Sequence, residues 1–265
     1  MRTVVAAGVL FLLVVLTAGS SKTETRRVLY RDGVTEAPLR VKAMDAAKRT
    51  WAGYYEEHHL HQQQTFLGAR FGQNPFDALV LQEILWAVKP DLIVETGTNS
   101  GGSTLYYAFL LEAINPTGKI VTMDMDPVDR WHGQWQQEVD PRTWSYWKER
   151  VTALVDAAGS TAPGVLERVR SMAALAKRVV VILDSCHEYE CVKGEIEAFA
   201  PLVTPGSYLI VEDTDKFPQG AGRAAREFAS ANGDRWRVDK TREYLYLTEH
   251  TDGYIKRSGS GEGAS

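Results

Sequence analysis

Short apolar runs alternate with longer amphipathic stretches through the middle of the chain. Five runs rich in aliphatic and β-branched residues predict strands, at 92–95, 119–124, 151–155, 179–184 and 207–212. Between them, apolar residues recur with helical spacing and predict helices at 102–114, 164–176 and 187–200. Strands joined by helices in this order are typical of a parallel sheet with crossover connections. We therefore expect an α/β fold with a doubly wound, Rossmann-like sheet that is mostly parallel.

The pattern changes at the end of the predicted sheet. A helix at 221–231 is followed by two apolar runs, 235–239 and 244–248, which a short polar loop joins. Such a pair predicts a C-terminal antiparallel hairpin at the sheet edge.

The segment before the sheet has a different texture. The stretch 43–64 is polar but carries aromatic residues, and it predicts a helix that covers the active site. A second helix is predicted at 76–88, with Pro75 at its first turn. We expect an N-terminal helical cover (22–75), a catalytic domain (76–257) and a Gly/Ser-rich disordered tail (258–265).

The first 21 residues are typical of a signal peptide. Arg2 precedes an apolar run from Val4 to Leu16, and small residues follow. The run is short for a membrane span, which takes roughly 20 apolar residues. Cleavage would give a secreted protein, whereas a retained anchor followed by basic residues would leave the domain on the cytosolic side of the membrane. Both interpretations stay open.

Charge and cysteine content limit the partners. The formal net charge is -4 and no Lys/Arg cluster exceeds a pair, which argues against a nucleic-acid partner and favours a small-molecule substrate. The two cysteines, Cys186 and Cys191, lie five residues apart at the start of the predicted helix 187–200. Residues at that spacing do not share a helix face, so we expect two thiols and no disulfide.

A glycine-rich turn follows the first predicted strand. The strand ends in Glu95 and turns through Gly97 and Gly101-Gly102 into a helix, with a spacing unlike the G-x-G-x-x-G of dinucleotide enzymes. A carboxylate suits the ammonium and sulfonium groups of S-adenosylmethionine, and Glu95 supplies one. The second strand ends in Asp124, where a ribose diol would lie. A tight connection at the turn and a helix cap at Asp124 are the structural alternatives.

Acidic residues end the fourth and fifth predicted strands. Because adjacent parallel strand ends converge, Asp184, Glu212 and Asp213 could form an oxygen-only site for Mg²⁺, which relieves their mutual repulsion. Such a metal lowers the pKa of a substrate hydroxyl, and His187 is placed to take its proton. The alternative is that Asp184 caps the following helix and His187 is an ordinary first-turn histidine.

One connecting segment, 127–150, carries four tryptophans among polar residues. Four such side chains in a connection need a surface to cover. That surface would be the N-terminal helices or a partner subunit, or the segment would be a substrate lid. Tryptophans at a surface are also compatible with a homo-oligomer.

Taken together, these motifs resemble the cephalosporin hydroxylase and rhamnosyl O-methyltransferase family of class I S-adenosylmethionine-dependent methyltransferases. The resemblance covers about 76–256 and rests on 88–97, 183–187, 200–208, 211–214 and 253–257. By this similarity, the metal would bind at Asp184, Glu212 and Asp213, and the cofactor would contact Glu95, Gly97, Thr98, Asn99, Ser103 and Asp124, with Ser160 and Thr161 near the adenine. The layout is also similar to catechol O-methyltransferases, which carry a catalytic lysine where His187 stands. Relatives tend to carry lysine where Gln73 stands, so the resemblance does not imply the substrate.

The expected function is Mg²⁺-assisted transfer of a methyl group from S-adenosylmethionine to a hydroxyl of a sugar, a phenol or a natural product, with Asp184 and His187 as catalytic residues. An NAD-dependent oxidoreductase would need three correctly spaced glycines, which this chain lacks. A non-catalytic secreted binding protein on the same fold is the other alternative.

Overall fold

The computed structural model describes residues 25–29, 36–132 and 138–259. The predicted signal segment and most of the predicted tail lie outside these residues, so both stay predictions. Among the described residues, no helix is both long enough and apolar enough to cross a membrane.

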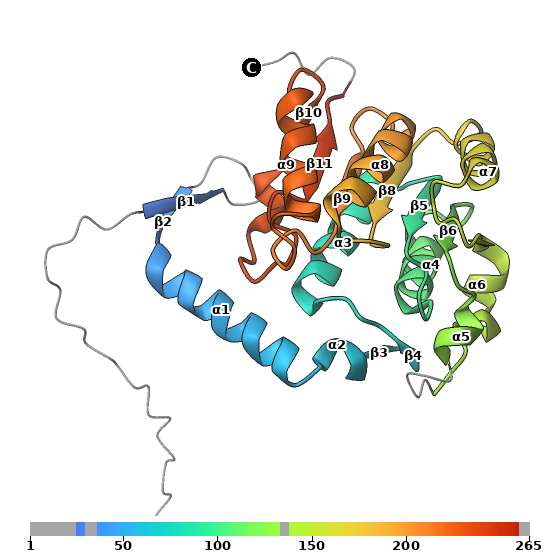
Figure 1. Ribbon diagram of the computed structural model, residues 1–265, viewed down its shortest axis with the longest axis horizontal. Coiled ribbons are helices and arrows are strands. Elements are labelled where there is room, and N and C mark those ends of the chain that lie inside the picture. The colour runs from blue at the N-terminus through green and yellow to red at the C-terminus, as the bar shows by residue number, and fades with distance from the viewer. Residues whose placement is uncertain (1–24, 30–35, 133–137, 260–265) are drawn as a thin grey trace, which may run out of the picture.

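A seven-stranded sheet forms the centre of the molecule (Figure 1). Its order across the sheet is β10 (Trp236–Val238), β11 (Tyr254–Arg257), β9 (Tyr208–Val211), β8 (Val179–Leu183), β5 (Leu92–Thr96), β6 (Lys119–Asp124) and β7 (Val151–Val155). The five strands from β9 to β7 are parallel. This confirms the predicted doubly wound sheet, with its turning point between β5 and β8.

Helices cover both faces of the sheet, which is why its central strands are continuous apolar runs. Successive side chains of β5 alternate: Leu92 and Val94 join one buried cluster and Ile93 joins the other. The first cluster includes residues of α7 (Pro163–Ala173), α8 (Tyr189–Phe199) and α9 (Ala221–Ala231). The second includes residues of α3 (Pro75–Val88) and α4 (Gly102–Ile114).

The C-terminal edge differs from the predicted hairpin. The strand β11 at 254–257 lies between β9 and β10 and is antiparallel to both. Residues 240–243 form a 3₁₀ helix, η3 (Lys240–Glu243), and 244–248 form no strand. The antiparallel element is confirmed, but the position of its second strand was wrong because 244–248 make tertiary contacts instead of sheet contacts.

The N-terminal cover consists of more than helices. It begins with an antiparallel pair, β1 (Thr25–Leu29) and β2 (Glu36–Arg40), followed by α1 (Val41–Glu57) and α2 (Leu60–Gln63). A short hairpin, β3 (Thr65–Phe66) with β4 (Ala69–Arg70), then brings the chain to α4. In Figure 1, α1 lies outside the layers of the main domain, and β4 ends near α4 and α5.

The tryptophan-rich connection between β6 and β7 forms α5 (Val128–His132), η1 (Pro141–Thr143) and α6 (Ser145–Arg150). Trp147 is buried in a cluster with Ala69 and Leu105, so this ring packs against the N-terminal segment and α4. Trp144 stacks on Tyr146. The side chains of Trp131 and Trp135 lie outside the described part of the chain. For Trp147 the structure therefore favours packing over a role as a lid.

The expectation of two thiols was wrong. Cys186 and Cys191 form a disulfide, with a Cα–Cα distance of 6.3 Å. The helix-face argument failed because α8 begins at Tyr189, two residues later than predicted. Cys186 therefore lies in the loop before the helix, where its side chain can turn toward Cys191.

Candidate active site

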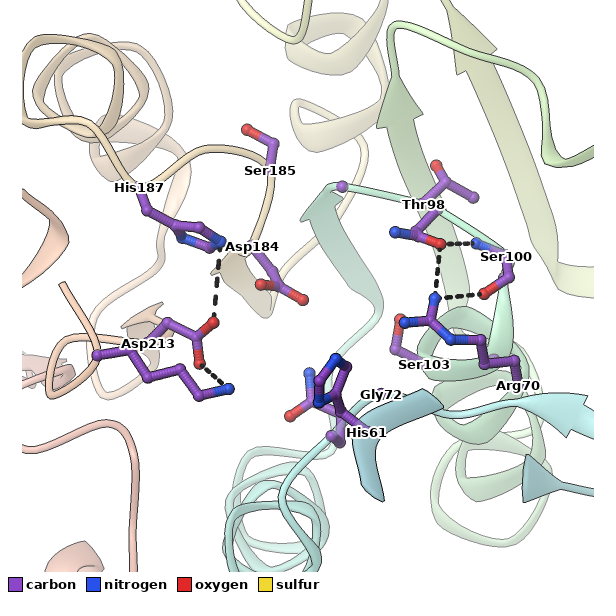
Figure 2. A pocket seen from close by; sticks show the side chains of 16 residues that line it. His61, Arg70, Gly72, Thr98, Ser100, Ser103, Asp184, Ser185, His187 and Asp213 are labelled. Atoms are coloured by element: carbon purple, nitrogen blue, oxygen red, sulfur yellow. Dashed lines mark hydrogen bonds and ion pairs between the residues drawn. The ribbon is translucent and has the colours of Figure 1, made fainter. Parts of the chain in front are cut away.

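A hollow of about 270 Å³ lies at the carboxyl ends of the central strands, where an open α/β sheet binds its ligands (Figure 2). Its lining comes from the β5–α4 turn, the β8–α8 loop, the loop after β9 and the N-terminal cover. The lining residues are His61, Arg70, Gly72, Gln73, Gly97, Thr98, Asn99, Ser100, Gly101, Gly102, Ser103, Asp184, Ser185, His187, Asp213 and Lys216.

The glycines of the β5–α4 turn make room for protein backbone. Gly97 has a φ of 87°, and a Cβ there would lie 2.1 Å from the carbonyl oxygen of Asp184. A Cβ on Gly102 would lie 1.7 Å from the carbonyl oxygen of Arg70. Gly97 thus lets the ends of β5 and β8 meet, and Gly102 lets the N-terminal cover lie against α4. These packing roles are separate from the close approach of a ligand that the sequence predicted for the turn.

Glu95 is buried and ties β5 to α4. Its Oε1 accepts a hydrogen bond from the Ser103 hydroxyl at 2.7 Å, and its Oε2 accepts one from Thr104. Glu95 is therefore outside the lining of the hollow, although Ser103, Gly97, Thr98 and Asn99 are part of it. The structure thus gives Glu95 an internal role, and its predicted contact with the cofactor stays a prediction.

Burial raises the pKa of Glu95 from 4.5 to about 7. The folded protein then holds this proton more tightly than the unfolded chain, so the Glu95 contribution to stability falls as pH rises from about 4.5 to about 7. We expect Glu95→Gln to remove this dependence. Between pH 5 and pH 8, the free energy of unfolding of the variant should gain about 3 kcal/mol relative to wild type, as measured by urea denaturation.

The matched control is Glu167→Gln, because Glu167 is exposed on α7. Its stability difference from wild type should not change with pH. A constant difference for Glu95→Gln over the same range would contradict the buried, protonated carboxyl.

Two of the three acids predicted to cluster, Asp184 and Asp213, lie together at the ends of β8 and β9, along with His187. Ligand atoms of Asp184, His187 and Asp213 all lie within 4.8 Å of one another. Asp184 follows β8, with its backbone N–H donating to the Thr96 carbonyl at 3.1 Å. Asp213 has a φ of 55°, a conformation that non-glycine residues rarely adopt, and its N–H donates to Nδ1 of His250 at 3.0 Å. This strained backbone turns Asp213 toward Asp184 and His187.

Glu212 lies deeper than the other two predicted metal ligands. Its Oε2 accepts a hydrogen bond from Gln73 Nε2 at 2.5 Å, and its Oε1 is buried without a hydrogen-bond partner among the described residues. Burial and repulsion from Asp184 raise the pKa of Glu212, and burial with repulsion from Asp213 raises that of Asp184. Crowded carboxyl groups with an unpartnered buried oxygen fit a divalent cation, because a cation would stabilise their charged forms.

His187 is oriented by two neighbours. Its ring stacks on Phe217 at a centroid distance of 4.3 Å, and its Nε2 lies 3.8 Å from Oδ2 of Asp213. Burial lowers the pKa of His187 although Asp213 opposes the shift. The ring is therefore neutral near pH 7 and able to accept a proton at the edge of the hollow.

Six polar residues of the hollow were not predicted as site residues: His61, Arg70, Gln73, Ser100, Ser185 and Lys216. Lys216 contacts Asp213 at 3.6 Å and Glu249 at 2.9 Å. Burial opposes its charge, but Asp213 and Glu249 outweigh burial and raise the pKa of Lys216. In the sequence, Lys216 follows the pair Glu212-Asp213 by three residues, and Arg70 lies within the predicted cover. Neither position belongs to a motif with a distinctive spacing.

A second hollow adjoins the first, and Ser185 lines both. The predicted ribose and adenine residues Asp124, Ser160 and Thr161 line this second hollow, together with Met123 and the exposed Met125. Asp124 accepts the Asn99 N–H at 2.7 Å. The Ser160 hydroxyl donates to Glu195, so it holds its own loop in place. The first hollow is polar, and the second contains an acid and two thioethers. The pair fits one ligand whose amino-acid end lies in the first hollow and whose nucleoside end lies in the second.

Comparison with known proteins identifies the family. The Rhamnosyl O-methyltransferase/CmcI profile matches residues 58–258. The chain belongs to this family. The resemblance predicted from the motifs is thereby confirmed, and with it the class of enzyme, an S-adenosylmethionine-dependent O-methyltransferase.

Relatives and solved structures agree with this assignment. Rhamnosyl O-methyltransferase of Mycobacterium tuberculosis is 27% identical over 180 residues, which are 68% of this chain and 68% of that protein. The Mycobacterium leprae protein of the same name is 25% identical over 223 residues, 80% of this chain and 91% of that protein. A structure of CmcI with Mg-SAM has a TM-score of 0.56 at 18% identity, covering 74% of this chain and 77% of that chain. An apo structure of CmcI has a TM-score of 0.55 at 20% identity with the same coverage. Both structures share the predicted fold.

Proposed function

We propose that this enzyme transfers the methyl group of S-adenosylmethionine to a hydroxyl of a small molecule, with Mg²⁺ held at the ends of β8 and β9. The observation that carries the proposal is the convergence of Asp184, His187 and Asp213 beside the hollow at the turning point of the sheet. Family membership and the Mg-SAM complex of CmcI support the two cofactors.

Each residue of the cluster has a separate task. When bound, S-adenosylmethionine supplies an electrophilic methyl group and Mg²⁺ supplies positive charge that lowers the pKa of the acceptor hydroxyl. Asp184 and Asp213 would hold the cation, and the buried charge of Glu212 beside Asp184 would add to its attraction. His187 Nε2 takes the hydroxyl proton while Phe217 keeps its ring in place. Lys216 balances the negative charge of Asp213 and Glu249.

A sugar hydroxyl is the acceptor class that we propose first. The curated relatives are named rhamnosyl O-methyltransferases, and this supports a deoxysugar over a phenol. The hollow is lined mostly by polar side chains, which suits a polyol, since a sugar needs several hydrogen-bond partners.

Calorimetry and a transfer assay test the proposed function together. S-adenosylhomocysteine should bind and NADH should not. A labelled methyl group should appear on rhamnosides but not on catechols, be lost with EDTA and return with MgCl₂. Binding without transfer to any acceptor would favour a non-catalytic protein, and transfer that survives EDTA would contradict the role of the metal.

A further inference from the structure

The hollow has a guanidinium on one side and, on the other, a group of acids with Lys216 beside them. Figure 2 shows Arg70 and Ser103 on one side and Asp184, Asp213 and His187 on the other. Because the acids and Lys216 lie away from it, the guanidinium of Arg70 is the cation of the hollow that is placed to meet an anionic group of a ligand.

Contacts of both its side chain and its backbone fix the position of Arg70. Its Nη1 donates to Oδ1 of Asn99 at 3.1 Å and lies 3.4 Å from the Ser100 hydroxyl. Its carbonyl lies where a Cβ on Gly102 would be, so the N-terminal cover contacts the first turn of α4 without an intervening side chain. The preceding residue, Ala69, is buried against Leu105 and Trp147. These contacts fix the guanidinium at the rim of the hollow.

A guanidinium in this position suits a carboxylate better than any other part of the donor. Its planar N–H groups bind carboxylates through paired, charge-assisted hydrogen bonds. Asn99, which orients Arg70, also donates its backbone N–H to Asp124 in the second hollow. The β5–α4 turn therefore links Arg70, which faces the amino-acid end of the donor, with Asp124, which faces its ribose.

We propose that Arg70 binds the carboxylate of the methionine portion of the methyl donor, so that the N-terminal cover forms part of the cofactor site. This inference rests on the proposed function. The cover then has two tasks, to enclose the hollow and to select a donor with an intact amino-acid end.

The test compares two nucleosides that differ in that end. S-adenosylhomocysteine carries the carboxylate, and 5′-methylthioadenosine lacks the whole amino-acid portion. By calorimetry, Arg70→Gln should weaken binding of S-adenosylhomocysteine by about 10- to 100-fold, the range for a lost charged hydrogen-bond pair, and leave binding of methylthioadenosine unchanged. Arg70→Lys should recover part of the loss, because it keeps the charge but not the paired geometry.

Arg178→Gln is the matched control, because Arg178 pairs with Asp91 before β8, at the opposite end of the strands. It should change neither affinity. If the ratio of the affinities for S-adenosylhomocysteine and methylthioadenosine is the same in Arg70→Gln as in wild type, the role of Arg70 is overturned. This includes the outcome in which both affinities fall together because the turn is disturbed. Wild-type protein that binds neither nucleoside would overturn the proposed function, and this inference with it.

Discussion

Replacing Asp184 by asparagine should remove Mg²⁺ binding and lower kcat/KM by about 10³-fold, equivalent to about 4 kcal/mol of transition-state stabilisation. Asp184 is the member of the cluster that lies close to both Asp213 and Glu212. Without its charge, the remaining groups cannot hold a hard cation. The backbone contacts of Asp184 with Thr96 and Gly97 do not involve its side chain, so the variant should fold normally.

Thermal melts with and without MgCl₂ separate loss of the metal from loss of the fold. Without metal, the raised pKa of Asp184 means that its contribution to stability falls as pH rises above about 4, so the variant should melt at a higher temperature than wild type at pH 7. With MgCl₂ the wild type should gain stability and the variant should not. Asp234→Asn, at an exposed position, is the control. A variant that methylates its acceptor normally would refute the metal site.

Gly97→Ala should lower both stability and activity. The residue has a φ of 87°, and the added Cβ would lie 2.1 Å from the Asp184 carbonyl oxygen and 3.0 Å from the Ser185 Cα. Positive φ and the clash together should cost about 3 kcal/mol, which corresponds to a melting temperature lower by about 10 °C. Relief of the clash must separate the ends of β5 and β8 and move Asp184. We therefore expect about 10²-fold lower kcat/KM at 25 °C.

Gly53→Ala provides a control of opposite sign. Gly53 lies inside α1, and nothing lies within 4 Å of the position of its missing Cβ. Alanine there should stabilise the protein by about 0.5 to 1 kcal/mol with unchanged activity. Equal stability of Gly97→Ala and wild type would show that the two strand ends are not in contact.

The central strands were predictable because they are buried on both faces, as in β5 and β8, where every residue is buried. The bounds of β6 and β7 also match the prediction, although β7 lies at the sheet edge and is partly exposed. The stretch 244–248 has similar strand propensity but is held by side-chain contacts. Tyr244 donates to Glu83, Tyr246 to Asp45 and Thr248 to Asp77. Strand propensity cannot distinguish these two outcomes, since tertiary contacts decide between them.

The candidate site was predictable only where it follows the sheet. Asp124 ends β6, Asp184 directly follows β8 and Asp213 lies two residues after β9, so parallel topology alone gathers them at one edge. Arg70 and Lys216 reach the hollow from the cover and from a loop, whose positions depend on packing that no local pattern records. The disulfide was missed for a related reason, because it depends on the residue at which α8 begins.

The disulfide ties the loop between β8 and α8 to the first turn of α8, because Cys186 lies in the loop and Cys191 lies in the helix. Cys186 is next to His187, and both cysteines line the hollow that contains Asp124. Thiol reductants routinely added during purification would break this covalent link and free the segment that aims His187. The oxidation state of the two sulfur atoms should therefore be controlled whenever the catalytic rate of this enzyme is compared between preparations, because only the oxidised protein has this loop covalently tied to α8.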